Sequence, residues 1–237
     1  MKLDNISISG CLLATLCLFW GTMLGGCGKS SENGSVQETW IFKKNRTVKL
    51  GVFNVESGGL AVSDPGYALI SDVDPNSIRR VEKCLNGKWR AELVVKTFKT
   101  GSYGESDFQS ELWVMHESIS DPAKLTWSLE SSDVGVDTGT AGIWDAGHFH
   151  DKNTVPKDMF WTSGETKGKP TPSVPRDLWV SWCYELVKAP NFADVMTFGA
   201  VSSSGRGDGG YPLFVARDTA GNAVAAKIVF IDDSGKG

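Results

Sequence analysis

Short runs of β-branched and aromatic residues, each bounded by turn residues, fill most of the sequence after residue 46 and limit what it can fold into. In RAELVVKTF, residues 90–98, apolar positions alternate with charged ones, which is typical of a strand with one buried face. Comparable runs cover residues 47–55, 59–63 and 110–116. Residues 211–231 predict a hairpin whose turn, DTAGN, contains Gly221. These runs favour antiparallel sheets.

One segment has the spacing of a helix instead. Apolar residues of PRDLWVSWCYELVKAP recur every three to four positions, Pro175 suits a helix start, and Pro190 prevents continuation. We therefore expect one amphipathic helix over about 175–188, packed on a sheet. The sequence also allows helical turns at 76–85 and near 157–161. The predicted fold is mainly β (α+β), either an antiparallel sandwich or a half-open barrel.

The first 26 residues have the layout of a secretory signal peptide. Lys2 precedes the apolar run CLLATLCLFW, residues 11–20, and small residues follow it. Residues 24–27, Leu-Gly-Gly-Cys, resemble the bacterial lipobox. This resemblance implies that the Cys27 thiol receives diacylglycerol and that the leader is cut before Cys27. It also implies that further acyl chains such as palmitate are added. The alternative is an uncleaved anchor, but residues 9–24 fall short of the ~20 residues of a spanning helix.

Behind the leader we expect a flexible tether, residues 27–38, and a single β-rich domain, residues 39–237. The tether is polar and rich in Ser and Gly. In Gram-negative lipoproteins an aspartate after the acylated cysteine signals retention in the inner membrane, and this chain has Gly28 there. By resemblance to these sorting rules, we expect an outer-membrane lipoprotein that faces the periplasm. A formal net charge of −4 argues against nucleic acid as a partner. The expected membrane contact is the lipid on Cys27.

Two cysteines, Cys84 and Cys183, remain in the domain. In an oxidising periplasm they could pair as a disulfide. The alternative is that Cys183 is a buried small apolar residue and Cys84 a surface thiol.

Four stretches of the domain together resemble a bacterial domain family of unknown function. That family has an Asp-Pro step after an early strand, a VGVDSGQAGIFD-like segment, a helix with Trp and Cys, and a VSSSGYGDGxYP-like strand entry. The matching stretches here are Asp64-Pro65, residues 134–145, residues 182–185 and residues 201–212. Thr138 and Thr140 replace the family's Ser and Gln, and Arg206 stands where an aromatic residue is usual. The resemblance implies the fold and these positions more than any activity.

The glycine-flanked acidic turns in these stretches are the candidate ligand-binding sites. The candidates are Asp64, Asp137, Gly139, Asp145, Ser204, Gly205, Asp208 and Tyr211. Residues 201–212 do not form a P-loop, because no Gly-Lys-Ser/Thr follows and the next element is a strand. Each aspartate could simply cap a turn by accepting backbone hydrogen bonds.

A divalent cation is the alternative for the acidic turns, with Asp137, Asp145 and Asp208 as oxygen ligands. His148 and His150, next to Asp145, form a weaker zinc candidate. Trp144 and Trp161 lie beside glycine-rich segments and could line a groove for sugar or peptide, although a core position is the simpler expectation.

Three functions are consistent with this sequence. The first is a non-enzymatic binding module on the envelope, for instance an immunity or inhibitor protein whose partner is a secreted toxin or an envelope protein. The second is a metal-assisted hydrolase that uses the clustered aspartates. The third is a structural envelope lipoprotein. No catalytic residue is assigned, since Ser202, Ser203 and Ser204 lack the strand-to-helix turn of a nucleophilic serine.

Overall fold

The computed structural model describes residues 40–69, 77–101, 104–157 and 177–234. The predicted leader and tether, Cys27 included, lie outside these residues. The chain from Glu38 onward forms one compact unit. Its strands are β1 (Ile41–Val55), β2 (Gly59–Ser63), β3 (Arg79–Glu82), β4 (Gly87–Thr100), β5 (Gly104–His116), β6 (Trp127–Val136), β7 (Thr140–Asp145), β8 (Ala193–Met196), β9 (Gly199–Ser203), β10 (Gly209–Arg217) and β11 (Ala223–Val229). Its helix is α1 (Leu178–Leu186), and the 3-10 helices are η1 (Pro65–Leu69), η3 (Pro122–Lys124), η4 (Lys152–Thr154) and η5 (Pro190–Phe192).

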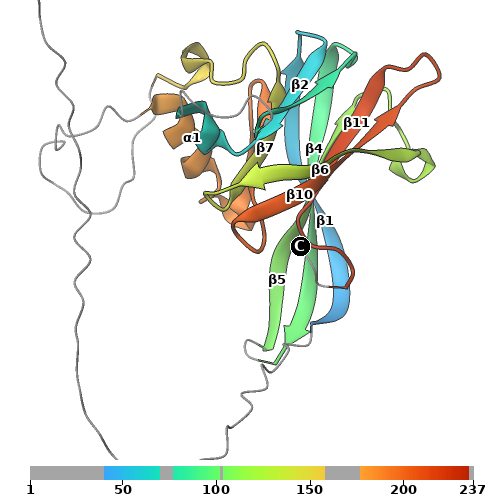
Figure 1. Cartoon of the computed structure of the whole chain (residues 1–237), viewed down its shortest axis with the longest axis vertical. Helices are drawn as coiled ribbons and strands as arrows, with labels where there is room; N and C mark the ends of the chain where they lie inside the picture. The colour runs from blue at the N-terminus through green and yellow to red at the C-terminus, as the bar shows by residue number, and fades with distance from the viewer. Residues whose placement is uncertain (1–39, 70–76, 102–103, 158–176, 235–237) are drawn as a thin grey trace, which may run out of the picture. The chain divides into compact units, whose positions relative to one another are not determined.

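The strands form two antiparallel sheets that pack as a sandwich and do not close into a barrel (Figure 1). The six-stranded sheet has the order β1-β4-β5-β11-β10-β6, and the five-stranded sheet has the order β3-β2-β7-β9-β8. In Figure 1 the lower parts of β1, β4 and β5 run side by side, as their continuous pairing requires. The prediction of a mainly β, antiparallel fold is confirmed.

The main core lies between the two sheets. Leu60 and Ile143 of the five-stranded sheet share one buried cluster with Trp89, Leu213 and Ile228 of the six-stranded sheet. Every residue of β2 and of β7 is buried, on both faces. A strand buried on both faces needs a second covering layer, and the middle of each strand is correspondingly free of charged residues.

Helix α1 supplies that second layer. Trp179 and Cys183 of α1 form a separate buried cluster with Trp144 of β7 and Met196 of β8. The rings of Trp144 and Trp179 lie 5.2 Å apart between centroids. The Asp177 side chain accepts a hydrogen bond from the Val180 backbone N–H, 3.1 Å, so the helix begins at residue 178. No helix among the described residues is long and apolar enough to cross a membrane.

The predicted strands and hairpin are present, although β1 and β5 each begin six residues earlier than the predicted runs 47–55 and 110–116. The hairpin of β10 and β11 closes through a hydrogen bond from the Asp218 N–H to the Asn222 carbonyl oxygen, and Gly221 has φ +84°. The helical turn expected at 76–85 is wrong, because residues 79–82 form β3. Val81 is fully buried there between exposed neighbours, and pairing with β2 decides its conformation.

The structure does not join Cys84 to Cys183, and the disulfide alternative is therefore wrong. Both thiols are free and buried. Cys84 belongs to the core between the sheets, whereas Cys183 lies in the cluster under α1. Burial raises the pKa of Cys84 to about 12 and that of Cys183 well above its ordinary value. The expectation of a surface thiol at residue 84 is also wrong.

Candidate functional site

Asp64, directly after β2, is fully buried and holds two turns together. Its carboxylate accepts hydrogen bonds from the backbone N–H groups of Gly66 (2.6 Å), Asp137 (2.9 Å) and Thr138 (2.8 Å). The Thr138 hydroxyl donates to it as well, at 2.9 Å. Asp64 therefore acts as the acceptor that fixes the turn between β6 and β7, and its oxygens point into protein rather than into a cavity.

Asp137, in that same turn, also has a protein partner. The Tyr67 hydroxyl donates to its Oδ2 at 2.9 Å. Burial, followed by the hydrogen bond to Asp137, raises the pKa of Tyr67 to about 12. The phenol consequently remains a donor at physiological pH, and the pair ties η1 to the β6–β7 turn.

The loop between β9 and β10, residues 204–208, lies against the β6–β7 turn. The Gly139 backbone N–H donates to Asp208 Oδ1 at 3.0 Å, and the Ser204 N–H donates to the Gly139 carbonyl oxygen at 2.9 Å. Hydroxyls of Ser204 and Tyr211 both donate to the Gly207 carbonyl oxygen, at 2.5 and 2.7 Å. The structure thus brings together residues 134–145 and 201–212, the two glycine-rich stretches that the sequence analysis singled out. These hydrogen bonds hold the 204–208 loop in place.

Gly205 is the tightest point of this loop. It has φ +69°, in the left-handed region that favours glycine. A Cβ at this position would overlap the carbonyl oxygen of Gln109 in β5. The loop can therefore lie on β5 only because residue 205 has no side chain.

Asp145, at the end of β7, belongs to a different place. It is fully buried and accepts hydrogen bonds from the backbone N–H groups of Glu56, Ser57 and Gly147, at 2.7, 2.8 and 2.9 Å. Its Oδ1 also lies 2.8 Å from His148 Nδ1. Burial alone would raise the pKa of Asp145, but these hydrogen bonds outweigh it and hold the pKa below its usual value. Asp145 fixes the turn between β1 and β2.

The predicted metal ligands do not converge. Asp145 is occupied by the β1–β2 turn, while Asp137 and Asp208 are engaged at the β6–β7 turn. His150 pairs with Asp177 at 2.8 Å rather than sharing a site with His148. Within the described ranges, no three His, Cys, Asp or Glu side chains are placed to hold a metal ion. The acidic turns serve as caps, which was the alternative interpretation of the sequence.

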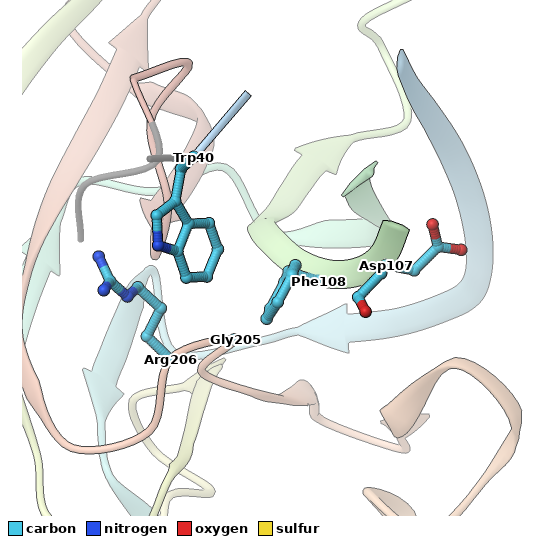
Figure 2. A pocket seen from close by; sticks show the side chains of 6 residues that line it. Trp40, Asp107, Phe108, Gly205 and Arg206 are labelled. Atoms are coloured by element: carbon cyan, nitrogen blue, oxygen red, sulfur yellow. The ribbon is translucent and has the colours of Figure 1, made fainter. Parts of the chain in front are cut away.

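Gly205 and Arg206 of the 204–208 loop also line a pocket (Figure 2). It has a volume of about 400 Å³. We name it the Trp40 pocket; its lining residues are Trp40, Ser106, Asp107, Phe108, Gly205 and Arg206. In Figure 2 the rings of Trp40 and Phe108 and the Arg206 side chain lie around one opening, whereas the Asp107 carboxylate points away from them.

Aromatic contacts hold the walls of the Trp40 pocket. The Trp40 ring lies 4.8 Å from the Phe108 ring and 5.5 Å from that of Phe98, measured between centroids. The Arg206 Cζ atom stacks 4.6 Å from the Trp40 ring centroid. A guanidinium over an indole face is an attractive cation–π arrangement. The pocket therefore offers apolar ring surfaces with a positive charge at the rim.

Sequence reasoning nominated only Gly205 among the residues of the Trp40 pocket. Arg206 was noted as a departure from the family pattern, and Trp40 and Phe108 were not noted. Trp144, considered for a groove, is buried under α1, and Trp161 lies outside the described residues. The available signal was Trp40 itself, a large aromatic residue at the junction between a polar tether and the first strand.

Comparisons with known protein families, with curated proteins and with solved structures find no match to this chain. The family resemblance described from the sequence stays a prediction.

Proposed function

We propose that this chain is a lipid-anchored envelope protein that binds a protein partner through the Trp40 pocket. The observation that carries the proposal is the pocket itself, with two aromatic walls, a stacked arginine and a volume of about 400 Å³. Volumes of this order suit a small ligand or one anchoring side chain of a larger partner. Tryptophan and arginine are also the residues most enriched at the energetic centres of protein interfaces.

The rigidity of the pocket supports binding. Asp208 and Ser204 fix the 204–208 loop to the β6–β7 turn, so that Arg206 is presented from a preorganised segment. A wall that is already ordered loses little conformational entropy when a partner arrives. The aspartates that were considered for catalysis are used here as structural acceptors, which favours a binding role over a hydrolytic one.

The chemistry of the pocket indicates the kind of partner. An apolar or aromatic side chain would pack in the pocket against the surfaces that Trp40 and Phe108 present to it. Acidic residues around it would be attracted by the positive charge of Arg206. A secreted toxin, or another protein of the envelope, is the partner class we propose, which would make this chain an immunity or inhibitor protein.

Anchoring is tested on the mature protein from envelope fractions. We expect its mass to correspond to a chain that begins at Cys27 and carries acyl groups. We expect Cys27→Ser to lose this modification and to leave the membrane fraction. A wild-type chain with its leader intact and no acyl group would overturn the anchoring part of the proposal.

Binding is tested by comparing what wild type and pocket variants retain from envelope and secreted fractions. We expect Trp40→Ala to lose a protein that wild type retains. Trp127→Ala is the matched control, because Trp127 is also half-buried and has a cation, the Lys227 amine, 5.0 Å from its ring centroid. Equal retention by wild type and Trp40→Ala would refute a role for the pocket.

A further inference from the structure

Strand β1 is basic although the chain as a whole is acidic. Its fifteen residues, IFKKNRTVKLGVFNV, contain four cations and no acidic residue, in a chain with net charge −4. The cations are Lys43, Lys44, Arg46 and Lys49, all exposed. Such a concentration of one sign on one strand creates a local positive potential that differs from that of the whole protein.

The first part of β1 is also an open edge that carries apolar side chains. β1 is the terminal strand of the six-stranded sheet, with β4 as its neighbour. Every residue from Ile41 to Thr47 is exposed, and the exposed fractions of Ile41 and Phe42 are 48% and 39%. We name Ile41, Phe42, Lys43, Lys44 and Arg46 the basic edge. Apolar side chains interleaved with lysine and arginine are typical of segments that lie at a membrane–water interface.

Acidic side chains near the basic edge are few and stand behind it. Among the described residues of this end of the sheet they are Glu105, Asp107 and Glu111 of β5, and Asp233. Asp107 pairs with Arg46 at 3.4 Å, whereas Glu111 and Asp233 pair with Lys96 of β4 at 3.1 and 3.0 Å. β5 is two strands behind the edge, roughly 10 Å at 4.7–4.9 Å per strand. The Asp107 side chain nevertheless reaches forward to Arg46. Asp107 therefore offsets part of the charge of Arg46, and a surface in contact with the basic edge meets the exposed Lys43 and Lys44.

We infer that the basic edge docks on a bilayer that contains anionic lipids. The charge of the edge is complementary to such a surface, where each lysine contributes to binding. The sequence adds a geometric reason, since only thirteen residues lie between Cys27 and Ile41, and the fourteen steps from one to the other span at most roughly 45–50 Å. If Cys27 is acylated as proposed, the edge is held close to the membrane at high effective concentration.

Pairing with a second copy of the chain is the competing use of an open edge strand. Lysines and bulges are the features by which edge strands avoid such pairing. β1 has both, with register irregularities between Phe42 and Lys44 and between Lys49 and Gly51. The interruption next to Lys43 would break a continuous ladder, whereas contact with lipid headgroups needs no ladder. A bilayer is therefore the better occupant.

The experiment uses the chain from Gly28 onward without lipid, since the residues from Glu38 form one compact unit with its own cores. Co-sedimentation is measured with vesicles of equal parts phosphatidylglycerol and phosphatidylcholine, and with vesicles of phosphatidylcholine alone. We expect binding to the anionic vesicles only, weakening as salt is added. Lys43→Ser with Lys44→Ser should lower the partition coefficient roughly thirtyfold, at about 1 kcal/mol for each lysine.

The matched control removes two exposed lysines elsewhere, Lys83→Ser with Lys88→Ser, near the opposite end of β4 from the basic edge. This control should bind like wild type. Equal binding to both vesicle types, or unchanged binding after loss of Lys43 and Lys44, would overturn the inference, as would a dimer in solution that these substitutions dissociate. Because no lipid is attached to the chain, failure here leaves the proposed acylation of Cys27 and the Trp40 pocket to their own tests.

Discussion

Replacing Asp145 by alanine should destabilise the domain more than most single substitutions. The carboxylate is fully buried and accepts hydrogen bonds from three backbone N–H groups, those of Glu56, Ser57 and Gly147. Alanine leaves these donors without an acceptor. A buried group that loses a charged partner costs about 1–3 kcal/mol, and contributions at one site are not fully additive.

We expect Asp145→Ala to lower the free energy of unfolding by about 4 kcal/mol, because three buried donors lose their acceptor together and their costs add only in part. In a domain of this size that corresponds to a fall in Tm of roughly 8–16 °C. Asp145→Asn keeps one acceptor oxygen, so its loss should be intermediate, about 2 kcal/mol.

The assay is urea unfolding followed by tryptophan fluorescence, with the slope of the transition checked for equality among variants. Asp121→Ala is the control, because Asp121 is 46% exposed and its carboxylate accepts one backbone hydrogen bond, from Ala123. It should lose no more than about 1 kcal/mol. If Asp145→Ala were no more destabilising than Asp121→Ala, the assignment of Asp145 as the acceptor that holds the β1–β2 turn would be refuted.

Three further predictions concern acid stability, the 204–208 loop and the thiols. Burial would raise the pKa of Asp177, but its hydrogen bonds lower the pKa from 3.8 to about 2. The ionised Asp177 therefore stabilises the folded protein fully above pH 3.8, and this contribution disappears as the pH falls towards 2. The difference in unfolding free energy between wild type and Asp177→Asn should close over that range. Gly205→Ala should lower the free energy of unfolding by at least about 2 kcal/mol, because a positive φ and an overlap with β5 combine at this position. Gly207→Ala should lower it by about half as much, because its Cβ would meet no atom of the described chain within 4 Å. Equal Tm values for the two variants would contradict this. Cys84 and Cys183 should react with a thiol reagent only after urea unfolds the chain, and fast reaction of either thiol in the native protein would show that it is not buried.

The strands were predictable because their apolar residues alternate and their turns carry glycine or aspartate. Tertiary contacts overrode the local pattern at residues 76–85. Ile78, Val81 and Leu85 have helical spacing, yet Val81 contributes to a strand because β2 offers it a ladder and a buried position. Such pairing depends on residues far away in the sequence, which a local pattern does not contain.

The candidate site was predictable only in part. Proline after Asp64 and glycine on both sides of Asp208 indicated the turns that these two residues hold, and these turns do lie together. The same pattern could not tell that Asp145 belongs to another turn. It also could not locate the Trp40 pocket, because strand register and the left-handed Gly205 bring Trp40, Phe108 and Arg206 together from three separate segments.

The position of β1 has a mechanical consequence. β1 begins directly after the tether and is hydrogen-bonded to β4 along its whole length. If Cys27 is the anchor, a pull on the tether enters the fold at Ile41, and one component of it acts along the strand axis. A load along the strand must slide β1 past β4, so that many backbone hydrogen bonds share the load and break together. A load across the strand would instead break these hydrogen bonds one at a time. The pairing with β4 would therefore keep the start of β1 in place under a pull along the strand.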